Sequence, residues 1–552
     1  MTLHRREFLT LAAALSASPA RAAPKDTLVI ALSARAVATL NPSMTTLGAD
    51  NWACCQIFDT LVAPDPGTFA ITPADFRPNL AESWSSSADA KTWIFSIRAG
   101  VQFHKGYGEL TAAAVAFTFG RLIDPKVVAS SKVLYENILS IAATGPRTVE
   151  FRLKRPDPLF CGSAIFTMSG NIVSKKAFEE RGEKFALDPV GTGPYQVDRV
   201  DFTKGVFLSA FKDHFAGAAA TPKLEVQYIL DTTARMLAFL SGQVDIIEGA
   251  RTPGWLQSIK QRKPDTIIDG TKPGSVNTFH FNITRKPLDD LRVRQAIRYA
   301  IDNAALAHAY GEMGGQMWGI NPPQFPGSVT DKDLPPELRY AYDPDKSKKL
   351  LADAGFGGGV TIACFTSQRE DYSAIMLMVQ EQLRKVGMNL DMRIVDHTAM
   401  HNDNRRDLNT IALNSSSYPP VQTQALLEQL AASSVVKPDG TGGTNYSHYG
   451  VAMPGVDALL QRVLDEPDFS KRMALCQDVE RQVLRDLPLL GLLTLSYITV
   501  RNPRIDLGYT VRSGYAYWPL RTAHKNLTRT HRQLPDRSFG AMLPPTTEET
   551  VA

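Results

Sequence analysis

Alternating and helical patterns of apolar residues run through most of the chain and predict a mixed α/β protein. Trp93, Phe95 and Ile97 alternate with more polar positions, as in a half-buried strand. Between positions 292 and 302 the apolar residues recur at helical spacing, after Asp289 and Asp290, whose charges favour a helix start. The same reasoning predicts strands over 224–229, 276–281 and 389–395, and helices over 111–124, 343–355, 371–387 and 470–487, with Thr111, Asp343 and Asp371 as N-caps. No fixed-period repeat occurs.

Residues 1–22 have the layout of an export signal. A basic start is followed by a short apolar, Ala-rich run and by small residues at Ala20 and Ala22. Arg5-Arg6 followed by Phe8-Leu9 resembles the twin-arginine (Tat) motif, and the alternative is an ordinary signal with two chance arginines. We expect removal of 1–22 after export by the Tat machinery, and a soluble periplasmic product. At the other end, residues 523–552 are polar and aperiodic, which predicts a mobile C-terminal tail.

Composition excludes several classes of protein. The 552 residues imply about three or four domain-sized units, and a 44% apolar content suffices for large cores. A net charge of +4 is small for this length, so we expect no nucleic-acid partner. Five scattered cysteines do not make a disulfide framework.

Sequence motifs for common enzyme chemistry are absent. The chain has no Gly-Lys dipeptide and therefore no usual P-loop, and it lacks the G-x-G-x-x-G, H-E-x-x-H, C-x-x-C and G-x-S-x-G patterns. We assign no catalytic residue, no cofactor and no metal, and expect the protein not to be an enzyme.

Two pairs of residues leave alternatives open. His397 and His401 are four residues apart, so on a helix both rings would share one face and could hold a divalent metal, although their surroundings are typical of a solvated surface. Cys54-Cys55 could form a vicinal disulfide or a soft-metal site, but two small apolar side chains in a packed helix are the commoner case.

Several short motifs, taken in order, resemble the extracellular solute-binding proteins of family 5, which serve ABC importers of oligopeptides, dipeptides, nickel chelates and related solutes. The most diagnostic is Pro189-Val-Gly-Thr-Gly-Pro-Tyr195, in which Gly191 and Gly193 permit backbone that side chains would block. The others include Leu40-Asn41-Pro42, Ile57–Leu61, Asn79–Trp84, Val101–His104, Ser241–Asp245, Asp290–Ile297, Tyr342–Pro344 and Asn445-Tyr446.

The resemblance implies two α/β lobes joined by a hinge, the fold of periplasmic binding proteins, with an extra subdomain in the first lobe. The first lobe would span 23–276 and be rejoined by 498–522, and the second would span 277–497. It also implies a monomer that captures a small solute by lobe closure and docks on an ABC permease, while a separate ATPase subunit hydrolyses ATP.

The ligand-binding residues are also expected from the resemblance. Peptide binders hold the α-amino group with an aspartate after a Trp-containing strand, but here the corresponding stretch has no tryptophan and no acidic residue from 408 to 427. An ammonium group would lack its counter-charge there. Neutral hydrogen bonds favour a peptide-like, opine-like or other amide- or hydroxyl-rich solute. Arg369 is the candidate for binding a carboxylate, and the alternative is an exposed surface arginine. Trp52 and Tyr446 are candidates for aromatic walls that stack on the solute, and the alternative for Trp52 is an ordinary core position. The candidates in the corresponding stretch are Asn414, Ser415, Ser416, Ser417 and Tyr418.

Two classes of function remain, besides a chaperone or sensor built on the same fold, which the sequence does not separate from them. The first is the periplasmic substrate-binding component of an ABC importer, as the ordered motifs indicate. The second is a secreted, Tat-exported enzyme or a cofactor- or metal-carrying protein on the same fold, since that route carries folded and often cofactor-loaded proteins.

Overall fold

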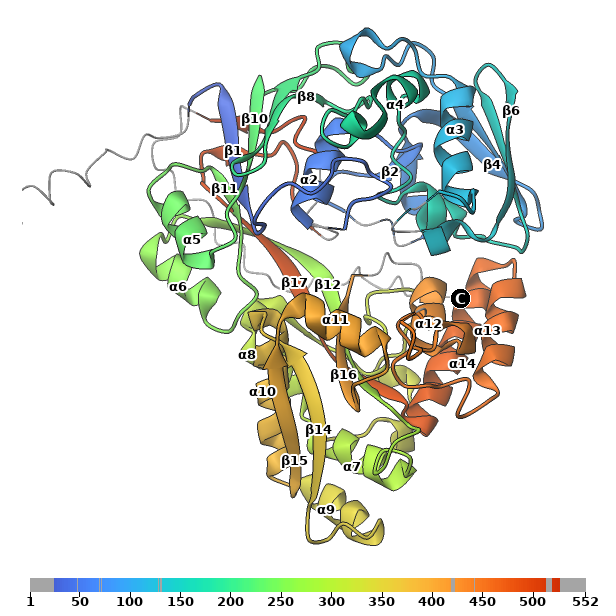
Figure 1. Cartoon of the computed structure of the whole chain (residues 1–552), viewed down its shortest axis with the longest axis vertical. Coiled ribbons are helices and arrows are strands. Elements are labelled where there is room, and N and C mark those ends of the chain that lie inside the picture. The colour runs from blue at the N-terminus through green and yellow to red at the C-terminus, as the bar shows by residue number, and fades with distance from the viewer. Residues whose placement is uncertain are drawn as a thin grey trace, which may run out of the picture.

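The computed structural model describes residues 24–526, except 47, 69, 71, 128, 130–131, 418–421, 441 and 513–518 and the side chains of 133 and 271–273. Two lobes lie one above the other in Figure 1, connected by two long strands. We call the lobe with β1 and α2–α6 the upper lobe and the lobe with α7–α14 the lower lobe. The expected signal, residues 1–22, lies outside the described residues. No helix in the described part combines the length and apolar character needed to cross a membrane.

The upper lobe contains the larger part of a nine-stranded sheet ordered β16-β12-β17-β11-β1-β10-β9-β8, with β13 paired to β17. In β1 every side chain is buried, and this strand pairs in parallel with both β10 and β11. The upper-lobe strands are β1 (Thr27–Leu32), β8 (Tyr195–Asp201), β9 (Gly205–Ala210), β10 (Lys223–Tyr228) and β11 (Ile246–Glu248). Helices α2 (Gly48–Ile57), α4 (Lys175–Arg181), α5 (Thr232–Leu240) and α6 (Trp255–Arg262) belong to the same lobe.

A separate four-stranded antiparallel sheet forms a subdomain of the upper lobe, as expected from the resemblance. Its order is β4-β5-β7-β6, and α3 (Ala112–Ile123) packs on β6 and β7. The predicted alternation at Trp93, Phe95 and Ile97 is confirmed, because all three are buried along β5. The strands are β4 (Ala81–Ser86), β5 (Thr92–Ile97), β6 (Ile138–Gly145) and β7 (Thr148–Leu153), and β2 (Val62–Pro64) pairs with β3 (Phe76–Pro78) nearby.

Strands β12 (Ile267–Phe281) and β17 (Leu489–Arg501) run side by side from one lobe into the other. Their register shifts between Thr271 and Ser275, which marks a bulge at the crossing. Gly274 has φ +72° there, and a Cβ at this position would lie 2.1 Å from the carbonyl oxygen of Leu495. Both the backbone conformation and the lack of space therefore exclude a side chain at position 274. The lobe boundaries expected at 276/277 and 497/498 both fall inside these two strands.

The lower lobe places helices around the ends of β12 and β17 and around a parallel pair of strands. Figure 1 shows β14 and β15 extending away from the upper lobe beside α10, whereas α11 and α12 lie at the end that faces the upper lobe. The elements are α7 (Leu291–Ala300), α8 (Asn303–Ala309), β13 (Gly314–Gln316), α9 (Pro344–Asp353), β14 (Val360–Ser367), α10 (Glu370–Arg384), β15 (Met388–Val395), α11 (His397–Arg405), β16 (Ile411–Ser416), α12 (Gln422–Leu430), α13 (Val456–Asp465) and α14 (Phe469–Asp486).

The predicted helices form with one to three residues of difference at their ends, but two of the three expected caps differ. Asp343 accepts a hydrogen bond from the Lys346 backbone N–H, as an N-cap should. Thr111 occupies the N-cap position of α3, yet its side chain makes no cap bond. Asp371 is not a cap, since Arg369 occupies that position in α10. Asp371 binds arginine side chains instead, as described below.

Residues 523–526, which the sequence assigned to the mobile tail, are part of the fold. Ala523 is fully buried, and β19 (His524–Lys525) pairs with β18 (Ile505–Asp506). The Lys525 ammonium group lies 2.8 Å from a carboxylate oxygen of the buried Asp245. The expected tail thus begins too early by these four residues, and 527–552 lie outside the described residues.

Candidate functional site

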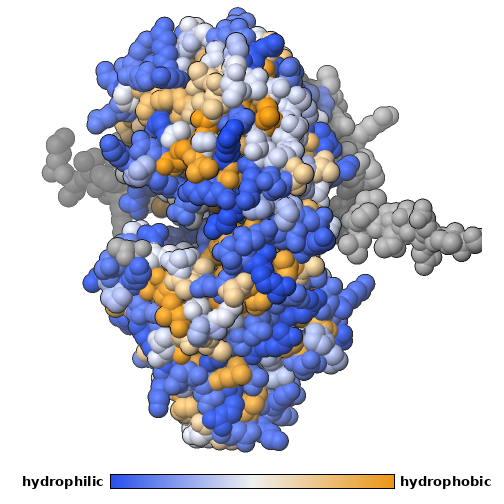
Figure 2. Space-filling view, turned by 90° about the vertical axis from the view of Figure 1, so that its right-hand side faces the viewer, coloured by the Kyte–Doolittle hydropathy of each residue, from blue (hydrophilic) through white to orange (hydrophobic). Residues whose placement is uncertain are grey.

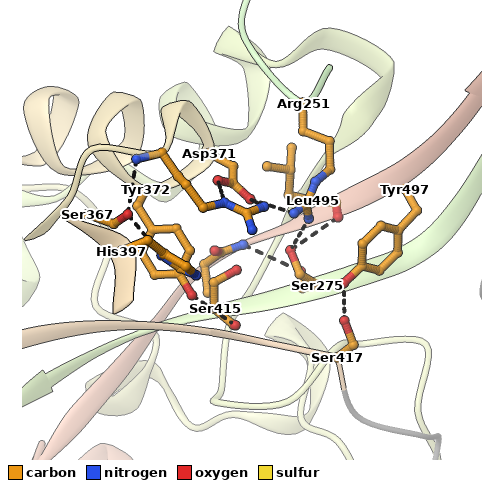
Figure 3. A network of polar contacts seen from close by, with 12 residues as sticks. Arg251, Ser275, Ser367, Asp371, Tyr372, His397, Ser415, Ser417, Leu495 and Tyr497 are labelled. Carbon is orange, nitrogen blue, oxygen red and sulfur yellow. Dashed lines mark hydrogen bonds and ion pairs between the residues drawn. The ribbon is translucent and has the colours of Figure 1, made fainter. Parts of the chain in front are cut away.

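A buried carboxylate at the junction of the lobes binds two arginines (Figure 3). Asp371, at the start of α10, lies 2.5 Å from Nη2 of Arg251, a residue of the upper-lobe loop between β11 and α6. It also accepts hydrogen bonds of 3.1 and 3.0 Å from Nε and Nη2 of Arg369. Burial opposes ionisation of Asp371, but the two guanidinium groups outweigh it and lower the pKa of this carboxyl group. One carboxylate therefore neutralises only one of two adjacent positive charges.

The strands that cross between the lobes complete this arrangement. Nη1 of Arg251 donates a 2.9 Å hydrogen bond to Oγ of Ser275 in β12. The guanidinium carbon of Arg251 lies 4.6 Å from the ring centroid of Tyr497 in β17, and Tyr497 contacts Ser417 through their hydroxyl groups. We call Arg251, Ser275, Arg369, Asp371, Ser417 and Tyr497 the Asp371 network. It joins both lobes and both hinge strands.

The serines of the predicted ligand stretch lie at and just after the end of β16. The Ser415 carbonyl oxygen accepts a 3.3 Å hydrogen bond from the Tyr372 hydroxyl, and Ser417 belongs to the Asp371 network. Ser416 donates to the side-chain oxygen of Asn414, whose Nδ2 is buried without a hydrogen-bond partner among the described residues. Tyr418 lies outside the described residues.

The two histidines do share one face of α11, as their spacing predicts. Their ring centroids are 4.6 Å apart, and the Tyr372 ring contacts both. Burial, followed by the charge of Arg369, lowers the pKa of His397, and burial, followed by His397, lowers that of His401 to about 4. These shifts favour the neutral form of both rings. Within the described residues, no group of three or more His, Cys, Asp or Glu side chains is placed to hold a metal ion.

Two predicted stacking residues are buried in the lobes. Trp52 is only 4% exposed and packs in the upper-lobe core, which is the alternative left open for it, and its neighbours Asn51 and Cys55 line the cleft instead. Tyr446 is 6% exposed and packs edge-on against the buried His280. We therefore do not retain Trp52 as a ligand wall.

A cavity of about 600 Å³ opens in the upper lobe and reaches the lower lobe at Ser417 and Gln424. The molecular surface is correspondingly hollowed between the two lobes in Figure 2. The wall includes a buried polar pair, since Nε2 of His214 lies 3.5 Å from a carboxylate oxygen of Asp59. Apolar side chains supply much of the remaining wall: Phe58, Phe76, Leu134, Phe166, Met168 and Phe215. Ser417 belongs both to this wall and to the Asp371 network.

The diagnostic glycine-rich motif forms part of the same wall. A Cβ on Gly191 would lie 2.2 Å from the Ile57 carbonyl oxygen, and one on Gly193 would lie 2.5 Å from the Ile57 carbonyl carbon. The glycines thus let this loop contact the end of α2, as predicted. Between them, Thr192 donates a 3.0 Å hydrogen bond to Asp59.

Cys54 and Cys55 lie in α2, and all five cysteines are free thiols. Cys54 is fully buried and its thiol lies 3.4 Å from the Leu40 carbonyl oxygen. The packed-helix interpretation is therefore correct for Cys54, whereas Cys55 faces the cavity.

Sequence reasoning found Arg369 and the serines but missed Arg251, the role of Asp371, and Tyr497. Arg251 and Asp371 are 120 residues apart in the chain, so no local pattern connects them. The cavity was also missed, because its wall is assembled from many separate segments.

Comparisons with known proteins agree with this architecture. The MoaA binding protein from A. tumefaciens R10, solved with mannopinic acid, is 30% identical with a TM-score of 0.79, and the match covers 91% of this chain and all of MoaA. DppA from Helicobacter pylori, solved with the peptide STSA, shares the fold at 23% identity and a TM-score of 0.74, over 91% of this chain and 98% of its own.

Among curated proteins, the glutathione-binding protein GsiB of Escherichia coli K12 is 28% identical over 323 residues, or 57% of this chain. The chain spans only 60% of the length of that relative. The sequence profile described as bacterial extracellular solute-binding proteins, family 5 middle, matches residues 75–434. The chain therefore belongs to the family 5 bacterial extracellular solute-binding proteins.

Proposed function

We propose that this protein is the substrate-binding component of an ABC importer and that it captures a small organic solute between its two lobes. The observation that carries this proposal is the cavity of about 600 Å³, whose wall is supplied mainly by the upper lobe and completed by Ser417 and Gln424 of the lower lobe. A solute in this cavity would contact both lobes and shift the molecule toward its closed form.

The charge of the Asp371 network favours an anionic group on the solute. Arg369 is the accessible member, with a side chain 52% exposed, while Arg251 beside it is 12% exposed. A carboxylate on the solute would meet the positive charge that Asp371 leaves unbalanced. Ser415, Ser416 and Ser417 would add neutral hydrogen bonds at the same end. The mannopinic acid bound by MoaA is an acid of this general kind.

The importer role also implies partners and a route of export. We propose that the loaded monomer delivers its solute to a membrane permease, whose ATP hydrolysis takes place on a separate subunit. The Arg5-Arg6 pair, with Phe8-Leu9, supports export through the Tat machinery and removal of residues 1–22 in the periplasm. Fractionation of cells carrying R5K/R6K tests this route, because a Tat-dependent protein would remain in the cytoplasm.

A solute screen on the purified mature protein tests the function. Thermal shift followed by calorimetry would cover sugar-acid opines, including mannopinic acid, together with glutathione, dipeptides, N-acylated amino acids and nickel–histidine. We expect at least one anionic solute to raise the melting temperature and to bind with one-to-one stoichiometry. If no member of the panel binds, the proposed function is wrong.

A further inference from the structure

Arg472 in α14 is only 2% exposed although it carries a charge, and its partners come from both lobes. Within the lower lobe, Nε donates 2.9 Å to the Glu466 carbonyl oxygen, and Nη2 donates 2.8 Å to that of Leu464. From the upper lobe, the Pro156 carbonyl oxygen accepts 2.8 Å from Nη2, and a carboxylate oxygen of Asp157 lies 3.4 Å from Nη1. We call Pro156, Asp157 and Arg472 the Arg472 clasp. Its guanidinium group is held by both lobes at once.

The two charged groups of the clasp are each fixed within their own lobe. The Asp157 carboxylate accepts hydrogen bonds of 2.9 Å from the Leu159 backbone N–H and 2.6 Å from the Ser163 hydroxyl. Ser163 belongs to the helical turn that also supplies Gly162 to the cavity wall. Arg472 is oriented by the two lower-lobe carbonyl oxygens. Because both side chains are already ordered, their contact across the lobes costs little side-chain entropy.

The clasp and the Asp371 network lie on opposite sides of the strands that cross between the lobes. Figure 1 shows α13 and α14 beneath the four-stranded subdomain, whereas α6 and α10 lie on the other side of β12 and β17. The apolar neighbour Leu159 is 6% exposed and belongs to the same hydrophobic cluster as Met473 of α14, whereas Phe160 belongs to the upper-lobe cluster. Charged contacts therefore join the lobes on both sides of the hinge strands.

We propose that the Arg472 clasp stabilises the closed form of the two lobes, with Arg472 and Asp157 as positioning residues that do not line the cavity. This inference rests on the proposed function, which depends on closure of the same lobes. Opening would separate Arg472 from Pro156 and Asp157, whereas the hydrogen bonds within each lobe would remain. Every partner in the clasp is a protein group, so the clasp forms without solute and lowers the free energy of the closed form relative to the open one. It also slows the release of a bound solute.

Small-angle X-ray scattering of the mature protein without solute tests the clasp. Arg472→Met removes the guanidinium group and keeps an apolar stem, Asp157→Asn removes only the charge on the upper lobe, and the double variant combines them. Arg485→Met is the control, an exposed arginine in the same helix whose Nη1 donates to Gln482. The melting temperature of each variant shows whether it is folded.

We expect Arg472→Met and Asp157→Asn to increase the radius of gyration and Arg485→Met to leave it at the wild-type value. The double variant should shift no further than Arg472→Met alone, because the two residues act through one contact. With the solute found in the screen, stopped-flow measurements should show dissociation about tenfold faster in Arg472→Met, as the loss of a charged hydrogen bond implies.

A merely structural role of Arg472 in α14 would lower the melting temperature without changing the radius of gyration. An unchanged radius in folded Arg472→Met, or additive shifts in the double variant, would therefore overturn the clasp. If solutes of the panel bind while the radius and the dissociation rate stay at their wild-type values, the clasp is wrong and the proposed function stands. If the radius shifts as expected but no solute binds, the clasp stands and the proposed function is wrong.

Discussion

The Asp371 network and the upper-lobe cavity share Ser417, but they differ in the polar groups that they contain. In the network, two guanidinium groups share one carboxylate, and the hinge strands supply further partners, so the charges stabilise one another. In the cavity wall, Nε2 of His214 lies 3.5 Å from a carboxylate oxygen of Asp59, and most of the remaining wall is apolar. The comparison indicates that the network connects the lobes through charged groups, whereas the cavity wall is mainly apolar.

Removing the shared carboxylate should cause the largest change. Asp371→Ala leaves the buried Arg251 and its neighbour Arg369 without their counter-charge, so we expect a loss of about 3–5 kcal/mol in the free energy of unfolding. Chemical denaturation measures this loss. Asp345→Ala is the matched control, because that carboxylate is 97% exposed in α9 and should change stability little. Equal effects of both variants would mean that the network does not stabilise the fold.

In the lower lobe, the buried Glu480 should make the free energy of unfolding depend on pH. Glu480 is fully buried in α14, and this burial raises its pKa to about 7, despite hydrogen bonds from Asn321, Gln422 and the Ile320 backbone. Because the folded pKa exceeds the unfolded value, the associated stability is complete below about pH 4.5 and is lost as pH rises to 7, by about 3 kcal/mol. Denaturation at pH 5 and 7.5 should show this loss in wild type and in the exposed control Glu337→Gln. The loss should disappear in Glu480→Gln, and a variant that retains it would refute the assignment.

In the upper lobe, His104 should make stability fall as the pH falls, the opposite of the effect of Glu480. Burial lowers the pKa of this imidazole to about 4, and its Nε2–H donates 2.9 Å to the Gly193 carbonyl oxygen. Because the folded pKa lies below the unfolded value, the stability is present above about pH 6.5 and is lost as pH falls to 4, by about 3 kcal/mol. His104→Gln should remove this acid sensitivity in denaturation curves, whereas the exposed control His308→Gln should retain it. Identical curves for both variants would contradict the prediction.

Arg369 should affect solute binding more than stability. Its side chain is 52% exposed and is proposed to bind the carboxylate of the solute, so Arg369→Met should weaken the binding of an anionic solute by about tenfold to a hundredfold, as the loss of a charged hydrogen bond implies. Calorimetry with the solute found in the screen measures this change. Arg384→Met, at the other end of α10 and paired with Glu381, is the control and should bind normally. If Arg369→Met binds the solute unchanged, Arg369 is an ordinary surface arginine without a role in binding.

The smallest effect is expected at the motif loop behind the cavity. Thr192→Val removes the 3.0 Å hydrogen bond to Asp59 in a fully buried position, and should cost about 1–2 kcal/mol of unfolding free energy. Thr361→Val on the exposed edge of β14 provides a control of the same chemistry. A loss as large as that of Asp371→Ala would contradict the expected difference in stability between the Asp371 network and the loop behind the cavity.

Local patterns predicted the elements well but not their contacts. Trp93, Phe95 and Ile97 identify β5 because period-two alternation is a local property of a strand. Asp371 was expected to cap a helix, which is also a local role, but Arg251 reaches it from 120 positions away. Trp52 was expected at the cleft, and the orientation of α2 turns it into the core while Cys55 faces the cavity.

The sequence by itself determined the two-lobed α/β architecture, the family and the close approach at Gly191 and Gly193, since these depend on periodicity, motif order and the absence of a side chain. Only the tertiary structure decided which charges meet between the lobes and which segments form the cavity wall. Arg251 meets Asp371, and Ser417 meets Tyr497, from distant segments that the crossing of β12 and β17 brings together. Their pairing depends on three-dimensional packing, which carries no signature in the spacing of residues along the chain.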